Sequence, residues 1–412
     1  MDKKSTSFTG NQKLQIFILA ITQFTVILDF MVMSPLGDFM MKSLSLSPSQ
    51  FGTAVSAYAY SAGLSGLLTA GFADRFDRKK LLLFFYTGFI VGTFLCGLSH
   101  SYYQLVAARI LTGIFGGVIG SISLAIITDL FSLEQRGRVM GFMQMGFGAS
   151  QVLGVPIGLF LANRWDWSAP FLLVAILACL ISLLIVFKLQ PITGHLSLQQ
   201  NKTVLRHLWH TLVKNNYYIG FISTALLSLG AFMMFPFGSA FAVNNLKISP
   251  AQLPLLFLVS GVCALFLMPL IGRLSDKINK AIIFTIASVW MIIVCLVYTQ
   301  LGETPLWMAI GYNVLLMMGI MSRMVPAMAL VSAVPEQEDR GAFMSINSSI
   351  QQISGGIAAS IAGLIVVQAH KAAPLEHYDK VAYVLSGISI VGIYVIFQVA
   401  KLVAKKSAAT PS

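Results

Sequence analysis

Three ionisable residues lie inside long apolar stretches of the 412-residue sequence: Asp29, Arg109 and Arg323. An ionisable side chain near the centre of a bilayer costs about 2.5–3.5 kcal/mol or more, so these residues are functional-site candidates. Helical spacing places Thr22, Thr25 and Asp29 on one face. We expect Asp29 and Arg109 to pair, directly or through water.

Two interpretations of the Asp29–Arg109 pair stay open. A structural ion pair, or an Arg109 side chain that extends to the membrane surface, would need no further function. In the functional interpretation Asp29 is a proton switch. Its carboxyl group is protonated when desolvated and ionised when Arg109 or water is near.

Arg323 lies far from both ends of its apolar stretch, on a helical face with Tyr312, while a stripe of methionines that includes Met317 lies roughly opposite. We assign the Arg323 face to the protein interior and the methionines to packing or lipid contact, because a charge facing lipid is costlier. Two roles for Arg323 stay open: binding an anionic or polar group of a substrate, or holding neighbouring helix ends together.

The composition indicates the environment of these charges. Apolar residues make up 57% of the chain, charged residues only 10%, and the mean hydropathy is +0.81. Globular proteins contain about 25% charged residues, so a soluble multidomain protein is excluded. Apolar segments long enough to span a bilayer occur at 14–36, 51–73, 80–99, 103–131, 138–162, 168–189, 217–242, 252–274, 281–300, 305–333, 341–369 and 380–402. Alternating strands are absent, so we predict an all-α integral membrane protein with twelve transmembrane helices.

The net charge of +12 indicates orientation. With a cytoplasmic N-terminus, 20 of the 27 Lys and Arg residues fall in cytoplasmic segments and 5 in outer ones. This asymmetry follows the positive-inside rule and predicts that both termini are cytoplasmic. It also accounts for the basic balance without nucleic acid as a partner.

The chain divides into two similar halves, 1–189 and 217–412. Residues 190–216 form a polar linker, in which Val204 to Val213 follow the pattern of an amphipathic helix on the cytoplasmic membrane surface. Asp74 and Asp276 occupy similar loops 202 residues apart, and Arg136-Gly and Arg340-Gly recur 204 residues apart. These two offsets indicate a duplication of six helices.

With its loop motif Ala70 to Lys79 and the second-half copy Gly272 to Lys280, the chain resembles a major facilitator superfamily transporter along nearly its whole length. The resemblance implies the fold of that family, with two pseudo-symmetric six-helix halves. It also implies a conformational latch at the cytoplasmic ends of the helices, which we assign to a set of charged residues: Asp74, Arg78, Asp129, Asp276 and Lys280.

The branch of the family is indicated by the fifth span, where Gly146, Gly154, Pro156 and Gly158 are similar to a helix-packing signature of exporters. Exporters of drugs and metabolites also carry an acidic residue in span one and an Arg-x-x-x-Gly stretch in span four, matched here by Asp29, Arg109 and Gly113. The resemblance implies proton-coupled efflux of a small amphipathic molecule by a bacterial inner-membrane antiporter. An uptake symporter on the same fold is the alternative, and a membrane sensor without transport is a further one.

Polar residues inside the spans are few, which argues against a highly charged substrate. The candidate substrate-binding residues are Thr22, Thr25, Gln144, Gln151, Tyr312, Asn313, Arg323, Asn347 and Gln351. No cluster with metal-ligand spacing and no nucleotide-binding loop is present, so we predict neither an enzyme nor a cofactor. The expected partners are a small-molecule substrate, protons and the lipid bilayer, and we expect a monomer.

Overall fold

The computed structural model describes residues 8–69, 75–194, 196, 204–336 and 338–409. At a few helical positions, which include Gln144 and Asp276, it describes the backbone alone. Asp74 lies outside the described residues. Within them, the chain is helical apart from its connections and one isolated bridge between Val367 and Glu376.

Nine segments of the described chain are long and apolar enough to cross a membrane: α1 (Gly10–Met33), α4 (Arg78–Gly97), α5 (Tyr102–Leu130), α8 (Ala169–Lys188), α10 to α11 (Tyr218–Asn244), α12 (Leu253–Lys277), α13 (Lys280–Tyr298), α14 (Leu306–Ser332) and α16 (Tyr378–Ala409). Three less apolar segments of similar length complete the predicted twelve: α3 (Pro48–Thr69), α6 to α7 (Leu133–Arg164) and α15 (Arg340–Ile365). The all-α prediction is confirmed, with span ends that mostly shift by a few residues.

Two predicted spans are interrupted helices. The fifth consists of α6 (Leu133–Ala149), a π-helical turn η2 (Ser150–Gly154) and α7 (Val155–Arg164). The seventh consists of α10 (Tyr218–Phe232), a 3₁₀ turn η4 (Phe235–Phe237) and α11 (Gly238–Asn244). Pro156 lies just after the first break, and Pro236 lies within the second. Because a proline cannot donate a backbone hydrogen bond, it interrupts the helical hydrogen-bond pattern at these positions.

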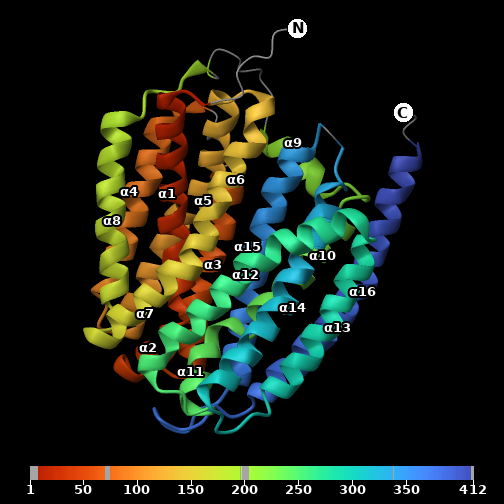
Figure 1. Ribbon diagram of the computed structural model, residues 1–412. Coiled ribbons are helices and arrows are strands. Elements are labelled where there is room, and N and C mark those ends of the chain that lie inside the picture. Colours follow the sequence, from red (N-terminus) through yellow and green to blue (C-terminus); the bar gives the residue numbers. More distant parts are fainter. Residues whose placement is uncertain (1–7, 70–74, 195, 197–203, 337, 410–412) are drawn as a thin grey trace.

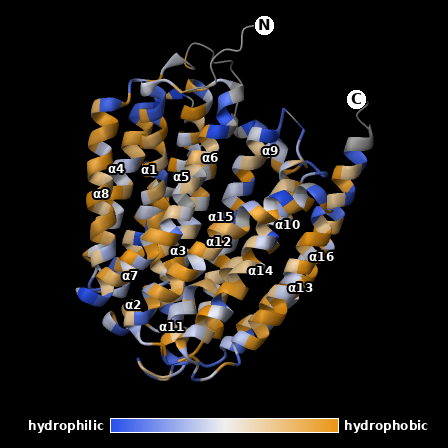
Figure 2. Cartoon of the chain, in the orientation of Figure 1, coloured by the Kyte–Doolittle hydropathy of each residue, from blue (hydrophilic) through white to orange (hydrophobic). Residues whose placement is uncertain are grey.

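The helices before and after the linker form two groups that lie side by side (Figure 1). We call the end of the molecule that carries the linker helix α9 (Val204–Leu212) the linker end, and the opposite end the far end. Hydrophobic residues cover the middle of the helices, and hydrophilic residues concentrate at the two ends (Figure 2). This distribution fits a protein whose middle faces hydrocarbon.

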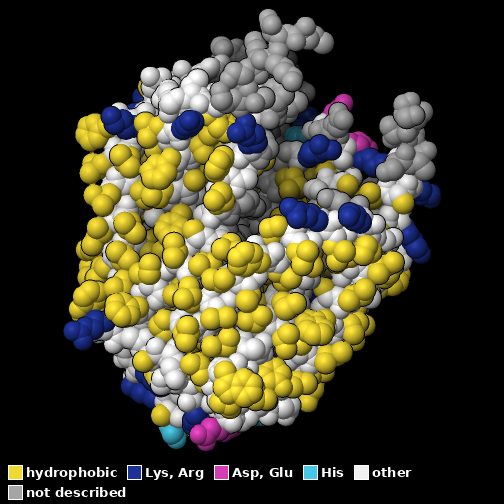
Figure 3. Space-filling model, in the orientation of Figure 1, with side chains coloured by type: hydrophobic (Ala, Val, Ile, Leu, Met, Phe, Trp, Pro, Cys, Tyr) yellow, Lys and Arg dark blue, Asp and Glu magenta, His cyan; other side chains and the backbone are white. Residues whose placement is uncertain are grey.

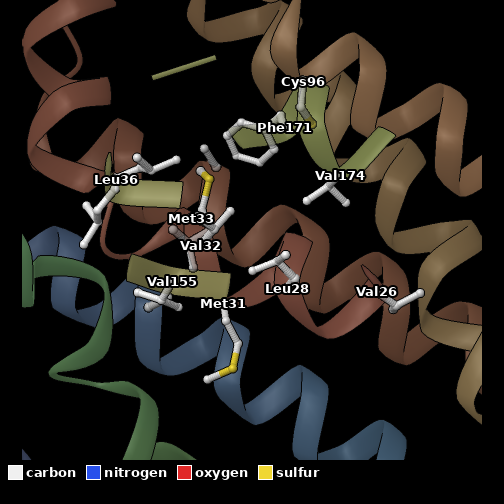
Figure 4. Close-up of a cluster of buried hydrophobic side chains, with 14 of the residues drawn as sticks. Val26, Leu28, Met31, Val32, Met33, Leu36, Cys96, Val155, Phe171 and Val174 are labelled. Atoms are coloured by element: carbon white, nitrogen blue, oxygen red, sulfur yellow. The ribbon is translucent and has the colours of Figure 1, made fainter. Parts of the chain in front are cut away.

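The glycines of span five let α1 approach closely. A Cβ atom at Gly158 would lie 2.6 Å from Cγ2 of Val32, and one at Gly154 would overlap the side chain of Leu28. Figure 4 shows Leu28, Val32 and Val155 within the buried apolar cluster that results. The small-residue pattern therefore packs α1 against span five.

The two helix groups are joined at the far end. The Ser34 hydroxyl donates to the Phe235 carbonyl oxygen, and the Ser239 hydroxyl donates to the Ser34 carbonyl oxygen at 2.9 Å. Asn244 Nδ2 donates to Asp38 Oδ1 at 2.7 Å; Asp38 lies in the short helix α2 (Gly37–Ser43). These contacts close the far end between the groups.

Helices α3 and α15 pack extensively against each other and form a seam between the two groups. Glycines Gly52 and Gly363 allow close backbone contact, since a Cβ at Gly52 would lie 3.0 Å from the Gly363 Cα. Deeper along the seam, Ser360 Oγ donates to Ser56 Oγ at 2.9 Å and lies 3.1 Å from Tyr60 Oη. At the linker end the groups separate and leave a hollow (Figure 3).

The linker helix α9 packs against the second group through one side. Leu208 and Thr211 are buried, whereas Trp209, Leu212 and Val213 are exposed. The predicted amphipathic helix is therefore present, but its apolar residues divide between the protein and the surface. The exposed apolar residues remain available to a membrane interface.

The linker is tied to the second group by an ion-pair cluster after α9. Lys214 Nζ lies 2.8 Å from Glu336 Oε2 and 2.9 Å from Asp339 Oδ2, and the Tyr217 hydroxyl donates to Asp339 Oδ2 at 2.8 Å. The hydrogen bond from Lys214 is the largest cause that lowers the pKa of Asp339. The hydrogen bonds to Glu336 and Asp339 raise the pKa of Lys214.

Replacing Lys214 by Gln should lower Tm by about 2 °C at pH 7, because the lost contacts are partly exposed and stabilise by roughly 1 kcal/mol. A carboxyl group with a lowered pKa stabilises above its unfolded pKa, and this contribution is lost as pH falls through the folded value. The difference in Tm from wild type should therefore be smaller at a pH below the usual pKa range of Asp than at pH 7. Thermal unfolding at both pH values tests this, with the exposed Lys371→Gln as control. A constant difference at both pH values would contradict it.

Candidate functional site

The predicted pairing of Asp29 and Arg109 is direct. Arg109 Nη1 on α5 donates to Asp29 Oδ2 on α1 at 2.8 Å, and both side chains are 0% exposed. The other carboxylate oxygen, Oδ1, accepts a 3.0 Å hydrogen bond from Thr93 Oγ1 on α4. Three helices of the first group thus meet at one buried carboxylate.

Arg109 is not fully satisfied by this arrangement. Its Nε and Nη2 atoms are buried without a hydrogen-bond partner in the described part of the chain. Its Cζ atom lies 4.5 Å from the centre of the Tyr58 ring on α3, which provides a cation–π contact. A guanidinium with two nitrogens that lack hydrogen bonds gains new partners when water or a polar ligand reaches it.

Gly113 sets the distance between α3 and α5 at this site. A Cβ atom there would overlap Ser61 Oγ and the Tyr58 carbonyl oxygen, closer than side chains approach one another. This glycine is one turn from Arg109, so it allows the Tyr58 ring to lie against the guanidinium.

Replacing Gly113 by Ala should destabilise the protein by about 1–3 kcal/mol, the usual cost of overpacking. It should also lower gradient-driven transport, because α3 must move and take Tyr58 away from Arg109. The matched control is Gly387→Ala on α16, where a Cβ meets nothing within 4 Å. Unchanged Tm and transport in Gly113→Ala would contradict this prediction, because α3 and α5 would then move apart without a cost in stability.

The two predicted threonines of α1 are buried on the same helix as Asp29. Thr22 Oγ1 donates to the Ile18 carbonyl oxygen of its own helix at 2.7 Å. Thr25 Oγ1 lies 2.9 Å from the Tyr86 hydroxyl on α4. Both are 0% exposed, so they face the interior of the first group and do not border the cavity described next.

A cavity lies between the two helix groups near the far end. Two predicted substrate-binding residues border it, Gln151 from η2 and Asn313 from α14. Most of the other lining side chains are apolar or aromatic: Met31, Val155, Met234, Phe235, Phe257, Tyr298, Leu316, Met317, Ile320 and Tyr378. Such a lining suits an amphipathic molecule that is held by a few polar contacts.

Three other predicted residues lie outside this lining. Asn347 on α15 accepts a 2.6 Å hydrogen bond from Thr224 Oγ1 on α10, and Gln351 is half-buried one turn further along α15. Tyr312 packs against the apolar core. The side chain of Gln144 lies outside the described part of the structure.

Arg323 lies inside the second helix group. Its side chain is 2% exposed, and Nη1 lies 2.9 Å from the Met291 sulfur and 3.2 Å from the Ser389 hydroxyl. No carboxylate in the described residues pairs with it, and its Nε and Nη2 atoms have no partner there. The predicted interior position of Arg323 is confirmed. The cavity, however, is bordered by Met317 and not by Arg323, because α14 turns the side that carries Asn313 and Met317 toward the first group.

The predicted latch residues are only partly described. Arg78 Nε, at the start of α4, donates to Asp129 Oδ2 at 3.1 Å and forms an ion pair at the linker end. Lys280 Nζ donates to the Ser275 carbonyl oxygen at 3.0 Å. Asp74 and the side chain of Asp276 lie outside the described part, so the latch itself stays a prediction.

Two members of the site were missed by sequence reasoning. Thr93 lies in the apolar 80–99 segment, which also contains the hydroxyl side chains of Tyr86, Thr87 and Ser99, so the sequence does not single it out. Tyr58 lies in an alanine- and serine-rich segment, where nothing in the pattern distinguishes it from Tyr60. The rotation of each helix about its own axis decides which tyrosine meets Arg109.

Comparison with known proteins gives the family of the chain. The sequence profile described as Major Facilitator Superfamily matches residues 19–359 and 220–411, which together include nearly all of the chain.

Relatives include a protein of Bacillus subtilis described as an uncharacterized MFS-type transporter, 25% identical over 375 residues, or 90% of this chain and 94% of that protein. A probable sugar efflux transporter of Helicobacter acinonychis is 23% identical over 66% of this chain and 68% of its own length. The vacuolar membrane amino acid uptake transporter fnx2 of Schizosaccharomyces pombe is 37% identical over 150 residues, or 36% of this chain but only 26% of that protein.

Solved structures share the fold. A bacterial homolog of the human lysosomal transporter Spinster superposes with a TM-score of 0.80 at 16% identity, over 97% of this chain and 99% of that chain. A D-xylose–proton symporter superposes with a TM-score of 0.73 at 17% identity, over 93% and 96%. With the profile match and the helical arrangement, these findings establish that the chain belongs to the major facilitator superfamily of membrane transporters.

Proposed function

We propose that the protein is a proton-coupled exporter of a small amphipathic or weakly polar molecule. The observation that carries the proposal is the buried Asp29–Arg109 ion pair, since both side chains are 0% exposed and lie within membrane-spanning helices. Removing a paired charge from water is costly, and replacing such a pair by apolar residues is often neutral or stabilising. A pair kept at this depth is therefore better explained by proton transfer than by stability.

The coupling step follows from the contacts of the carboxylate. When a proton reaches Asp29, its attraction to Arg109 weakens, and Thr93 can still donate to Oδ1. The guanidinium is then free to turn toward water or a substrate, and α1, α4 and α5 can shift relative to one another. Loss of the proton restores the ion pair and the original packing.

The proposed substrate path uses the space between the helix groups. The two halves, 1–189 and 217–412, would rock about the α3–α15 seam and open the cavity at each end in turn. Gln151 and Asn313 would hold polar groups of the substrate, while Met31, Phe235 and Met317 contact its apolar part. The glycine and proline signature of span five supports export over uptake by resemblance.

The proposed setting is a bacterial cytoplasmic membrane, with the protein acting as a monomer. The excess of Lys and Arg in the segments at the linker end supports a cytoplasmic location for that end and for both termini. The hollow between the groups would then open to the cytoplasm, and the hydrogen bonds around Ser34 would close the outer face.

Energised inverted membrane vesicles test the direction of transport. An exporter should accumulate a substrate inside such vesicles when their interior is acidified, and an uncoupler should release it. A panel of amphipathic dyes and radiolabelled sugars is first screened by ligand-dependent thermal shift on purified protein, and the hits are then used as probes. Accumulation in right-side-out vesicles instead would indicate the uptake symporter, and binding without counterflow would indicate a sensor.

A further inference from the structure

A groove on the outer surface of the second helix group lies apart from the transport cavity. It forms at the linker end, where the start of α10 meets the last turns of α16. Tyr218, Ile219 and Leu402 form the apolar part of its lining, and five polar side chains form the rest: Asn215, Asn216, Gln398, Lys401 and Lys405. No hydrogen bond or ion pair ties these five side chains to other groups in the described part of the protein.

The groove carries a concentrated positive charge. Lys401 and Lys405 lie one turn apart on α16, and both are exposed. The first turn of α10 contributes the positive end of its helix dipole, because no acidic residue lies in that turn and no side chain caps it. These three features favour an anionic ligand with hydrogen-bond acceptors.

The surface below the groove is apolar. Tyr394 is four residues before Gln398 on the same face of α16 and is 66% exposed, and Phe397 is 38% exposed. On α10, Tyr218 and Ile222 are 56% and 44% exposed. Lys and Arg side chains gather at the linker end above a band of hydrophobic side chains on this side of the molecule (Figure 3). A ligand of this groove therefore has an anionic head and apolar chains.

We propose that this groove binds the headgroup of an anionic phospholipid, with the phosphate between Lys401, Lys405 and the start of α10. The acyl chains lie along the exposed side chains of Tyr218, Ile222 and Tyr394. Basic pockets between transmembrane helices at the membrane surface are suited to such headgroups. The lipid would lie at the hinge between the linker and the first helix of the second half.

Native mass spectrometry of the purified full chain tests the site, with phosphatidylglycerol and phosphatidylcholine titrated at equal concentrations. We expect phosphatidylglycerol to bind more tightly to the wild-type protein. Each Lys near an anionic surface contributes roughly a fivefold gain in affinity, so K401Q/K405Q should bind about 30-fold more weakly. Lys406→Gln is the matched control, since this neighbouring lysine donates to the Val334 carbonyl oxygen at 3.0 Å, away from the groove.

Three results would overturn the proposal. Equal binding of the two lipids would remove the charge preference, and an equal loss in Lys406→Gln would remove the site. Inorganic phosphate is the third test. If it raises the Tm of wild type as much as phosphatidylglycerol does, and raises the Tm of K401Q/K405Q by less, the groove is a site for free phosphate. None of these measurements uses transport, so the lipid site and the proposed export can fail independently.

Discussion

Replacing Asp29 by Asn should abolish gradient-driven transport while leaving substrate exchange across the membrane intact. An asparagine side chain cannot take up or release a proton, so the substrate can no longer draw on the proton gradient. One proton moved across one pH unit supplies about 1.4 kcal/mol, a tenfold concentration ratio. In Asp29→Asn this ratio should fall to about 1 in proteoliposomes with an imposed pH gradient.

Exchange without a gradient separates loss of coupling from loss of the fold. The amide introduced by Asp29→Asn resembles a protonated carboxyl group in shape: its oxygen can accept from Arg109 while its NH2 group donates to the Thr93 hydroxyl. Counterflow, in which labelled substrate exchanges for unlabelled substrate, needs no net proton movement and should persist. Full gradient-dependent accumulation in this variant would disprove Asp29 as the coupling residue.

The matched control replaces an acid of the same type outside the membrane interior. Asp166 lies in the exposed connection between α7 and α8, at the far end. Asp166→Asn makes the same chemical change, and it should keep both gradient-driven transport and counterflow. Loss of coupling in both variants would indicate a general effect of charge rather than a site.

The ion pair and the helical fold could be predicted from the sequence because lipid makes charges and backbone groups costly. In the first half, Asp29 and Arg109 are the two Asp, Glu, Lys or Arg residues that lie away from the ends of the apolar spans, so they had to pair or face water. Backbone hydrogen bonds must be satisfied within each span, which leaves helices as the solution. Both arguments depend on composition and depth, which a sequence contains directly.

Helix rotation could not be predicted from the sequence. In lipid, an apolar residue is equally suitable on an inner or an outer face, so the pattern does not indicate which side of α14 meets the cavity. Met317 and Asn313 border the cavity while Arg323 turns inward, and Tyr58 rather than Tyr60 meets Arg109. Close packing at glycines such as Gly113 decides these rotations, and it emerges only when all helices are in place.

The same substitution at the two buried arginines should change stability in opposite directions. Arg109→Met leaves the Asp29 carboxylate buried without its counter-charge, which costs about 3–5 kcal/mol. Arg323→Met removes a guanidinium whose contacts, within the described residues, are with a thioether, a hydroxyl and the Phe284 ring. Replacing a buried charge by an apolar side chain of similar length stabilises by about 1–4 kcal/mol. Thermal unfolding in detergent should therefore show a lower Tm for Arg109→Met and a higher one for Arg323→Met.

Transport by Arg323→Met then decides between the two roles of this residue. A charge that destabilises its own surroundings is kept for function, so we expect turnover to fall at least tenfold while Tm rises. Binding of an anionic or polar substrate group predicts that the ligand-dependent thermal shift is lost as well. If Arg323 instead holds α10, α13 and α16 together, Tm should fall and the remaining folded protein should bind ligand normally. The sign of the change in Tm distinguishes the roles because an unpaired charge and a structural contact contribute to stability with opposite signs.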